Sequence, residues 1–293
     1  VPEELNSIIY SNQKLLYDAL YHAASATLNE LSKDAKYLGA DIGYICILHT
    51  WGSAMNYHPH IHTIVLGGGL DDENKWKETG GKFFLPYGVI SKVFRGKYLD
   101  ELKSLWNDSK LKFHGTAEKY QNSYRFKELL DKCYEKNWVT YCKETFNGAQ
   151  SVINYLGKYT HRIAISNHRI KSMTDTTVTY VVKDYKNEGC WKEKTISGEE
   201  FIRRFMMHVP PKRFVRIRHY GLLSCRNKRK KITHCRNLLG CKKYISTLKN
   251  LNAVEMIRVL YHIDVCKCSS CGGNMVSPRK DKYSSSFRAH MRC

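Results

Sequence analysis

The sequence predicts an α+β fold, in which helices and strands follow one another without a regular strand–helix–strand alternation. Two stretches carry this prediction. Residues 4–34 repeat apolar side chains with the 3.6-residue period of a helix. Residues 43–50 form a nearly continuous apolar run, typical of a buried strand, and a second strand is predicted at 60–66 after a loop. We expect these strands to pair antiparallel in a central sheet that helices flank.

The remaining chain divides into further short elements. Asn187-Glu188-Gly189 predicts a hairpin turn between strands at 176–185 and 191–196, and a capping box at Ser197 predicts a helix through Met207. Other helices are expected at 88–106, 121–135, 148–160, 236–249 and 252–262, and other strands at 83–85, 138–142 and 162–165. We expect four regions: an N-terminal helix at 1–36, a core with insertions at 37–222, a basic helical region at 223–262 and a Cys/His-rich module at 263–293.

The composition indicates a nucleic-acid partner. The 293 residues include 48 Lys and Arg against 27 Asp and Glu, a net charge of +21, which favours a polyanion. Twenty Tyr and five Trp can stack on unpaired bases. No apolar run is long enough for a membrane helix and the first residues do not form a signal peptide, so we expect a cytoplasmic, nucleoid-associated bacterial or archaeal protein whose cysteines are reduced. Because there is no initiator Met, we expect a fragment or a processed product.

A short histidine motif suggests a metal site. Strand alternation places His60 and His62 on one face and turns Ile61 and Val65 toward a core on the other. Two adjacent imidazoles can hold a divalent cation, although His-x-His also occurs in strands without a function.

Two tyrosines suggest a nucleophile. Tyr155 and Tyr159 are four residues apart on a predicted helix and therefore share a face. Spacing alone is not specific, because the pairs at 17/21 and 120/124 have it too. This pair, however, is followed by basic residues that can contact a DNA backbone, among them Lys158 and Arg162.

Three phrases together resemble a known family. They are His-Thr-Trp-Gly-x5-His-Pro-His-Ile-His with a following Gly-Gly-Gly-Leu, then Tyr-Leu-Gly-Lys-Tyr-Thr-His-Arg-Ile-Ala-Ile-Ser-Asn, then Arg-Ile-Arg-His-Tyr-Gly-Leu-Leu. In this order they resemble the two-tyrosine rolling-circle transposases of the HUH endonuclease superfamily, insertion-sequence family ninety-one, over about residues 2–240.

The resemblance implies a specific activity. His60-Ile61-His62 would be the metal motif of an HUH core, and Tyr155 and Tyr159 would be paired nucleophiles that nick and rejoin single-stranded DNA at transposon ends and targets. The family uses Mg²⁺ or Mn²⁺, forms 5′-phosphotyrosine intermediates and needs no nucleotide cofactor. We expect no membrane association, and no protein partner is evident. The family usually carries a Cys-rich zinc module ahead of the long helix, a segment that this sequence does not contain.

Such enzymes usually have a third metal ligand, and three candidates remain open. Gln150 lies near the tyrosines on the same predicted helix, His58 shares the strand parity of His60, and His49 lies on the preceding strand. We favour Gln150, because an amide oxygen suits a hard cation better than a third imidazole does.

Two further regions complete the predicted contacts. The basic stretch from Lys212 to Lys231 is expected to bind the DNA backbone through residues that include Arg213, Arg216 and Arg218. In the tail, Cys268-x2-Cys271 and His290-x2-Cys293 have the spacing of a structural Zn²⁺ site, and a disordered cysteine-rich tail is the alternative.

A non-catalytic nucleic-acid-binding protein with a structural metal is the alternative function. Both histidines and both tyrosines are present, which a protein without chemistry would not need to keep, and this favours the enzyme.

Overall fold

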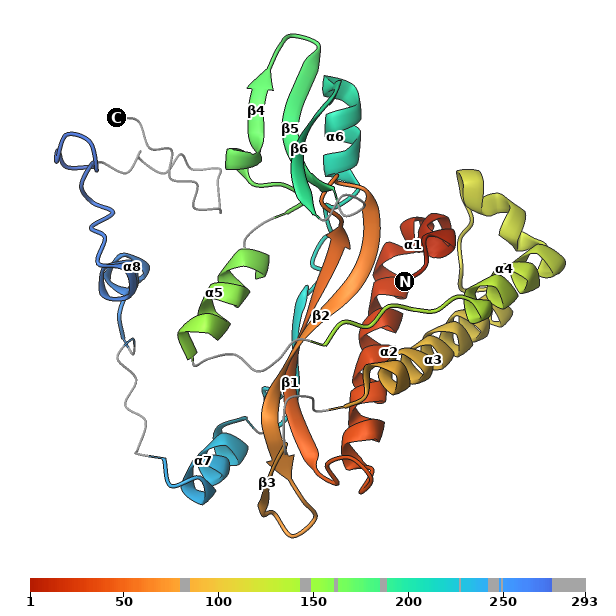
Figure 1. Ribbon diagram of the computed structural model, residues 1–293, viewed down its shortest axis with the longest axis horizontal. Coiled ribbons are helices and arrows are strands. Elements are labelled where there is room, and N and C mark those ends of the chain that lie inside the picture. The colour runs from red at the N-terminus through yellow and green to blue at the C-terminus, as the bar shows by residue number, and fades with distance from the viewer. Residues whose placement is uncertain are drawn as a thin grey trace. The chain divides into compact units, whose positions relative to one another are not determined.

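A four-stranded antiparallel sheet forms the centre of the structure, a computed structural model (Figure 1). It contains β1 (Asp41–Trp51), β2 (Tyr57–Leu70), β3 (Trp76–Glu78) and β7 (Ile217–Gly221), in the order β3-β2-β1-β7. β1 pairs antiparallel with both β2 and β7. The predicted antiparallel pair of strands at 43–50 and 60–66 is therefore confirmed, with longer strands than expected.

The structure describes residues 1–79, 85–142, 149–160, 163–184, 189–226, 228–241, 248 and 250–275, with the backbone alone at 149–150 and 158–160. Two compact units are formed, Val1–Gly240 and Cys241–Cys293. The predicted boundaries at residues 36, 222 and 262 divide the chain more finely and stay predictions.

Helices cover one face of the central sheet and form the main core with it (Figure 1). They are α1 (Asn6–Ser11), α2 (Gln13–Lys33), α3 (Tyr87–Asn107) and α4 (Ser123–Glu135), with short 3₁₀ turns at Glu3–Leu5 and Gly115–Gln121. Tyr44, Cys46 and Leu48 of β1 are buried in this core. The single helix predicted at 4–34 is interrupted at Asn12, whose side chain is hydrogen-bonded to both backbone groups of Lys112, at 2.7 Å each.

The opposite face of the sheet lies toward α5 (Ala149–Thr160), as Figure 1 shows. This helix matches the prediction for residues 148–160. Its hydrogen bond to β2, described below, fixes its position relative to the strands.

A second sheet has the order β4-β5-β6 and consists of β4 (Ile170–Met173), β5 (Thr177–Asp184) and β6 (Cys190–Ser197). A 3₁₀ turn at Asn167–Arg169 precedes it, and α6 (Gly198–Met206) follows it. The predicted hairpin is confirmed, and the Ser197 hydroxyl accepts a hydrogen bond from the Glu200 backbone at the start of α6.

Two helices near the C-terminus lie in different units. α7 (Lys228–Leu238) follows β7 in the first unit, and α8 (Ala253–Tyr261) belongs to the second. A reciprocal capping box between Asn252 and Glu255 begins α8, as its sequence favours.

Three predicted elements are wrong. Residues 138–142 form no strand, because Trp138 packs into the main core and its indole donates to the Cys133 carbonyl at 2.9 Å instead. Residues 163–165 are not a strand either, since Ala164 has a left-handed φ of 57°. The helix predicted at 236–249 does not start at residue 236, because residues 236–238 are the end of α7 and Gly240 has a left-handed φ of 62°; residues 242–247 and 249 lie outside the described residues. The strand predicted at 83–85 falls largely outside the described residues.

Within the described part of the chain, no helix is both long and apolar enough to cross a membrane.

Gly221 tests how tightly β7 is held against β1. Its φ is +57°, and a Cβ there would lie 1.8 Å from the carbonyl oxygen of Ile42. Gly221→Ala should lower the free energy of unfolding by about 3 kcal/mol or more, because it adds a backbone clash to left-handed strain. Urea denaturation measures this change. Gly96→Ala, in open space on α3, is the control and should be neutral or stabilising by up to about 1 kcal/mol. Equal midpoints for the two variants would contradict the described register.

Candidate metal centre

The register of β1 and β2 brings a third histidine to the motif. His49 lies directly opposite His60, and Ile47 lies opposite His62. Directly opposed residues of an antiparallel pair point to the same face, so all three imidazoles share one face of the sheet. Ile61 and Val65 pack against the main core on the other face, as the alternation predicted.

The three imidazoles lie close enough to hold one cation. Their candidate ligand nitrogens all fall within 4.8 Å of one another. The Nε2 atoms of His60 and His62 are 2.9 Å apart, and the rings of His49 and His62 have centroids 4.2 Å apart. The donor set therefore fits a divalent metal ion, as predicted, and does not by itself identify the metal.

Burial keeps the imidazoles of His60 and His62 neutral. Burial lowers the pKa of His60 to about 3 and that of His62 to about 4, so at neutral pH both have a lone pair for a metal. His60 Nδ1 is 2.6 Å from the His58 carbonyl oxygen. That carbonyl only accepts, so Nδ1 carries the proton and Nε2 is left to bind a cation, the arrangement typical of ligand histidines.

Tyr155 of α5 is joined to this cluster. Its hydroxyl oxygen is 2.6 Å from His62 Nδ1, a contact across 93 residues of sequence. The prediction that the tyrosine helix covers the metal face agrees with this contact. The backbone of α5 places Tyr159 about 6 Å further along the same helix face, and its side chain lies outside the described residues.

The third ligand has a candidate that the sequence alone did not favour. His49 is 2% exposed and stacks on Trp51, with ring centroids 4.7 Å apart. His58 is exposed and contributes its backbone carbonyl to the cluster. The side chain of Gln150, the favoured ligand at the level of sequence, lies outside the described residues. The geometry thus supports His49, and the role of Gln150 stays a prediction.

A fourth histidine, which the sequence analysis did not identify, is hydrogen-bonded to the loop between β1 and β2. His208 is 2% exposed and its Nε2 donates to the Met55 carbonyl at 3.1 Å, while Nδ1 is 3.2 Å from the Thr50 hydroxyl. Met55 is fully buried with a left-handed φ of 55°. Because His208 lies more than 150 residues from both partners, no local sequence signal indicates this role.

The predicted DNA-contacting residues have different surroundings. Arg213 is exposed. Arg218 forms an ion pair with Asp18, and its guanidinium lies 4.0 Å from the Tyr21 ring centroid, so it also has a structural role. Arg216 is half-buried, and burial lowers its pKa. The side chain of Lys158 and the whole of Arg162 lie outside the described residues. DNA binding by these five residues stays a prediction.

The C-terminal unit contains a tight hairpin around the first cysteine pair. The Gly272 backbone donates to the Cys268 carbonyl at 2.9 Å, and the Cys268 backbone donates to Gly273 at 2.8 Å. Gly272 has a φ of +69°, which favours glycine. This turn resembles the knuckle that zinc-binding Cys-x2-Cys pairs need. His290 and Cys293 lie outside the described residues, so the zinc site stays a prediction.

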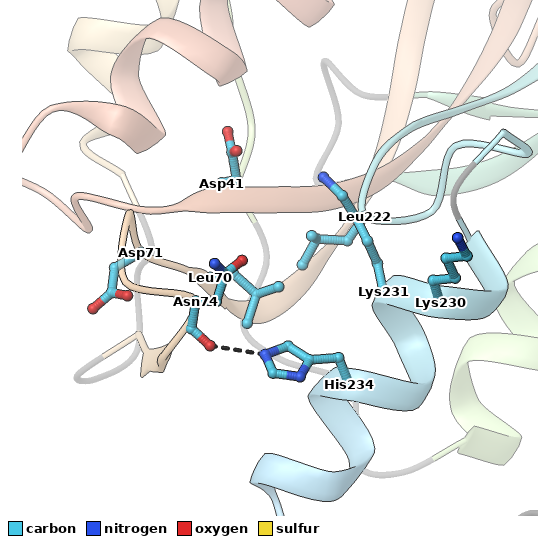
Figure 2. Close-up of a pocket in the computed structure, with 8 residues that line it drawn as sticks. All are labelled: Asp41, Leu70, Asp71, Asn74, Leu222, Lys230, Lys231 and His234. Atoms are coloured by element: carbon cyan, nitrogen blue, oxygen red, sulfur yellow. Dashed lines mark hydrogen bonds between the residues drawn. The ribbon is translucent and has the colours of Figure 1, made fainter.

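A cavity of about 210 Å³ lies apart from the histidines, between α7 and the start of β1 and the turn after β2 (Figure 2). His234 donates to the Asn74 carbonyl at 2.9 Å across it. Its lining mixes two acidic and two basic side chains with apolar ones, namely Asp41, Leu70, Asp71, Asn74, Leu222, Lys230, Lys231 and His234. With none of the three histidines and no tyrosine in this lining, the cavity is a less suitable candidate for the chemistry than the metal centre.

Comparison with known proteins defines the family. Residues 43–231, which include the three histidines and α5, match the family described as "Putative transposase" (Y2_Tnp). The chain belongs to this transposase family, which confirms the resemblance seen in the sequence.

Two relatives show how far the similarity extends. The chain is 39% identical over 241 residues to "Putative transposase y4qJ" of Sinorhizobium fredii (strain NBRC 101917 / NGR234), covering 82% of this chain and 61% of that protein. It is 28% identical over 279 residues to "Transposase for insertion sequence element IS801" of Pseudomonas savastanoi pv. phaseolicola, covering 94% and 65%. The chain thus spans less than two thirds of either relative. No solved structure matches it.

Metal titration of histidine variants tests the ligand set. His60→Ala and His62→Ala should each abolish Mn²⁺ binding, and His49→Ala should weaken it about tenfold or more, since each removes a nitrogen donor. Isothermal titration calorimetry gives the affinities. Gln150→Ala separates the two candidate third ligands, and His58→Ala, which keeps the backbone carbonyl, is the control. If Gln150→Ala weakens binding and His49→Ala does not, the all-histidine set is wrong.

Zinc analysis tests the C-terminal hairpin. The His60→Ala/His62→Ala variant, which lacks the metal centre, should still contain one Zn²⁺ per chain, because thiolates bind Zn²⁺ tightly. Adding Cys268→Ser or Cys271→Ser should remove that ion, as measured by plasma emission on purified protein. Cys225→Ser alters an exposed cysteine of the first unit and should have no effect. A zinc content that is the same in all variants would exclude the predicted site.

Proposed function

We propose that this chain carries the catalytic part of a transposase that nicks and rejoins single-stranded DNA through 5′-phosphotyrosine intermediates, with an HUH-type metal centre. The supporting observation is the contact of 2.6 Å between Tyr155 and His62 of the three-histidine cluster. Neither a metal site nor a tyrosine by itself indicates phosphodiester cleavage, because both occur in proteins with many other functions. Their direct contact supports the proposal, because it would bring a nucleophile next to a phosphate-binding cation.

The three histidines would hold the cation, and His62 would orient the nucleophile. A divalent cation at the three nitrogens would neutralise the scissile phosphate and align its phosphorus for attack. If its Nε2 held the cation, His62 would carry its proton on Nδ1 and would donate a hydrogen bond to the Tyr155 oxygen. Hydrogen bonding to the charged form favours that form, so His62 then stabilises the phenolate that attacks.

The choice of metal follows from the donors. Three imidazoles suit a transition-metal ion better than Mg²⁺, whereas the amide oxygen of Gln150 would suit Mg²⁺ or Mn²⁺. The identity of the third ligand therefore determines which metal the site prefers, and metal titration of the His49→Ala and Gln150→Ala variants tests both.

The proposed reaction exchanges one phosphodiester for another. The Tyr155 hydroxyl loses its proton to solvent and its oxygen forms a bond to phosphorus. The bond from phosphorus to the 3′-oxygen breaks with its electron pair on that oxygen, which takes up a proton from solvent to become a 3′-hydroxyl. The 5′ end of the DNA stays attached to the tyrosine. Attack by a 3′-hydroxyl on the phosphotyrosine reverses the step and joins strands, so the reaction needs no nucleotide cofactor.

A second tyrosine lets the enzyme handle two strands. While Tyr155 holds one 5′ end, Tyr159, one helical turn away, cleaves the second strand. The net charge of +21 supports binding of the DNA backbone. We propose single-stranded DNA at the ends of a mobile element and at its target as the substrate.

Conservative tyrosine variants test this proposal, because Tyr→Phe keeps the ring and removes only the attacking oxygen. Tyr155→Phe should abolish the first covalent adduct with labelled single-stranded DNA and a divalent metal, on a denaturing gel. Tyr159→Phe should still form that adduct and fail in strand transfer, and the double variant should form none.

The pair at 120 and 124 has the same spacing, so Tyr120→Phe/Tyr124→Phe is the matched control and should keep full activity. An adduct formed by the Tyr155→Phe/Tyr159→Phe variant would place the nucleophile elsewhere. Tight DNA binding by the unaltered chain without any adduct would favour the non-catalytic alternative.

A further inference from the structure

Among the described residues, α6 covers one face of the β4-β5-β6 sheet and the other face is open. Val178, Tyr180 and Val182 of β5 are buried, and Tyr180 and Val182 form a small core with Phe201 and Phe205 of α6. The alternate residues of β5 point the other way. On that open face, Thr179 and Thr195 share a hydrogen bond of 2.8 Å between their hydroxyls.

The open face presents a large aromatic side chain. Trp191 of β6 lies directly opposite Lys183 in the register and is 62% exposed. Trp is highly buried on average, so an indole exposed to this degree on a regular strand indicates a contact surface. Tryptophan is also an effective platform for an unpaired base, since every base has a face that stacks.

A positioned cation lies beside the indole. The guanidinium carbon of Arg169 is 5.8 Å from the Trp191 ring centroid. Arg169 Nε donates to the Val181 carbonyl at 2.9 Å, and the guanidinium also donates to the Ser53 carbonyl. Lys183 adds a second cation, while Glu193, two positions along β6, is the acidic residue of the same face. Two cations against one carboxylate make the surroundings of the indole positive, which suits a polyanion.

The same contacts connect this face to the metal centre. The backbone of Lys183 donates to the Ser53 hydroxyl at 2.6 Å, and Ser53 lies in the loop that joins β1 to β2. Ser53 is four residues beyond His49, a span of at most about 13 Å. The Arg169 guanidinium that donates to Ser53 lies a further 5.8 Å from the Trp191 ring centroid, so one short single strand could reach both the indole and the histidines.

We propose that Trp191, with Arg169 and Lys183, binds an unpaired nucleotide of the DNA strand a few positions from the bond that is cleaved. The base stacks on the indole, and the two cations contact the adjoining phosphates. This inference rests on the proposed function for its substrate, single-stranded DNA. It adds a binding site on a separate sheet, outside the histidine and tyrosine cluster.

Equilibrium binding without metal tests the site independently of cleavage. Fluorescence anisotropy of a labelled oligo-dT strand, with EDTA present, should show about tenfold weaker binding for Trp191→Ala, because stacking of a base contributes about 1–3 kcal/mol. Trp191→Phe should recover most of the loss. Tyr124→Ala removes another aromatic side chain that is 72% exposed and should bind like the unaltered chain.

An abasic strand of the same length separates stacking from other effects. Without bases, Trp191→Ala and the unaltered chain should bind equally. Equal binding of oligo-dT by both proteins would overturn the proposal, as would an equal loss on the oligo-dT and abasic strands. The Tyr155→Phe/Tyr159→Phe variant should show the same Trp191 effect, so a failure of the cleavage proposal is distinguishable from a failure of this one.

Discussion

The pairing of β1 with β2 is the constraint on which the rest of the structure depends. A shift of one residue would turn every side chain of β2 to the other face of the sheet. His60 and His62 would then enter the apolar core, and Ile61 and Val65 would face α5. The register that puts His49 opposite His60 is thus specified by the burial of the apolar residues on the reverse side. One pairing produces both the core and the metal centre.

The loop between these strands is held by the second sheet, which gives that sheet a role in the site. Backbone carbonyls of Ser53, Ala54 and Met55 accept hydrogen bonds from Arg169, Arg204 and His208, respectively. A left-handed conformation at a residue such as Met55 costs about 1–3 kcal/mol and persists where the surroundings determine it. The β4-β5-β6 layer and α6 therefore position the loop that sets the spacing of the histidines, in addition to the surface around Trp191.

The positive charge that attracts DNA comes from the chain as a whole and not from the imidazoles of the metal centre. The chain carries a net charge of +21, which draws DNA from a distance. At the metal centre itself, burial lowers the pKa values of His60 and His62 to about 3 and 4, so these groups add no positive charge at neutral pH. In the proposed function, local charge at the scissile phosphate would come from a bound cation, and the buried imidazoles stay available as neutral ligands for it.

By itself, the sequence determined the features that local patterns encode. Its periodicities predicted the antiparallel pair, α5, the β5–β6 hairpin and the shared face of His60 and His62, because a side chain's direction in a helix or strand depends on its near neighbours. The tertiary structure decided the rest. Asn12 interrupts the first helix through a contact 100 residues away, and Trp138 joins the core where a strand was predicted. His49 completes the cluster through strand register, and His208 braces it from a distant segment. These features depend on partners far along the chain, which no local pattern identifies.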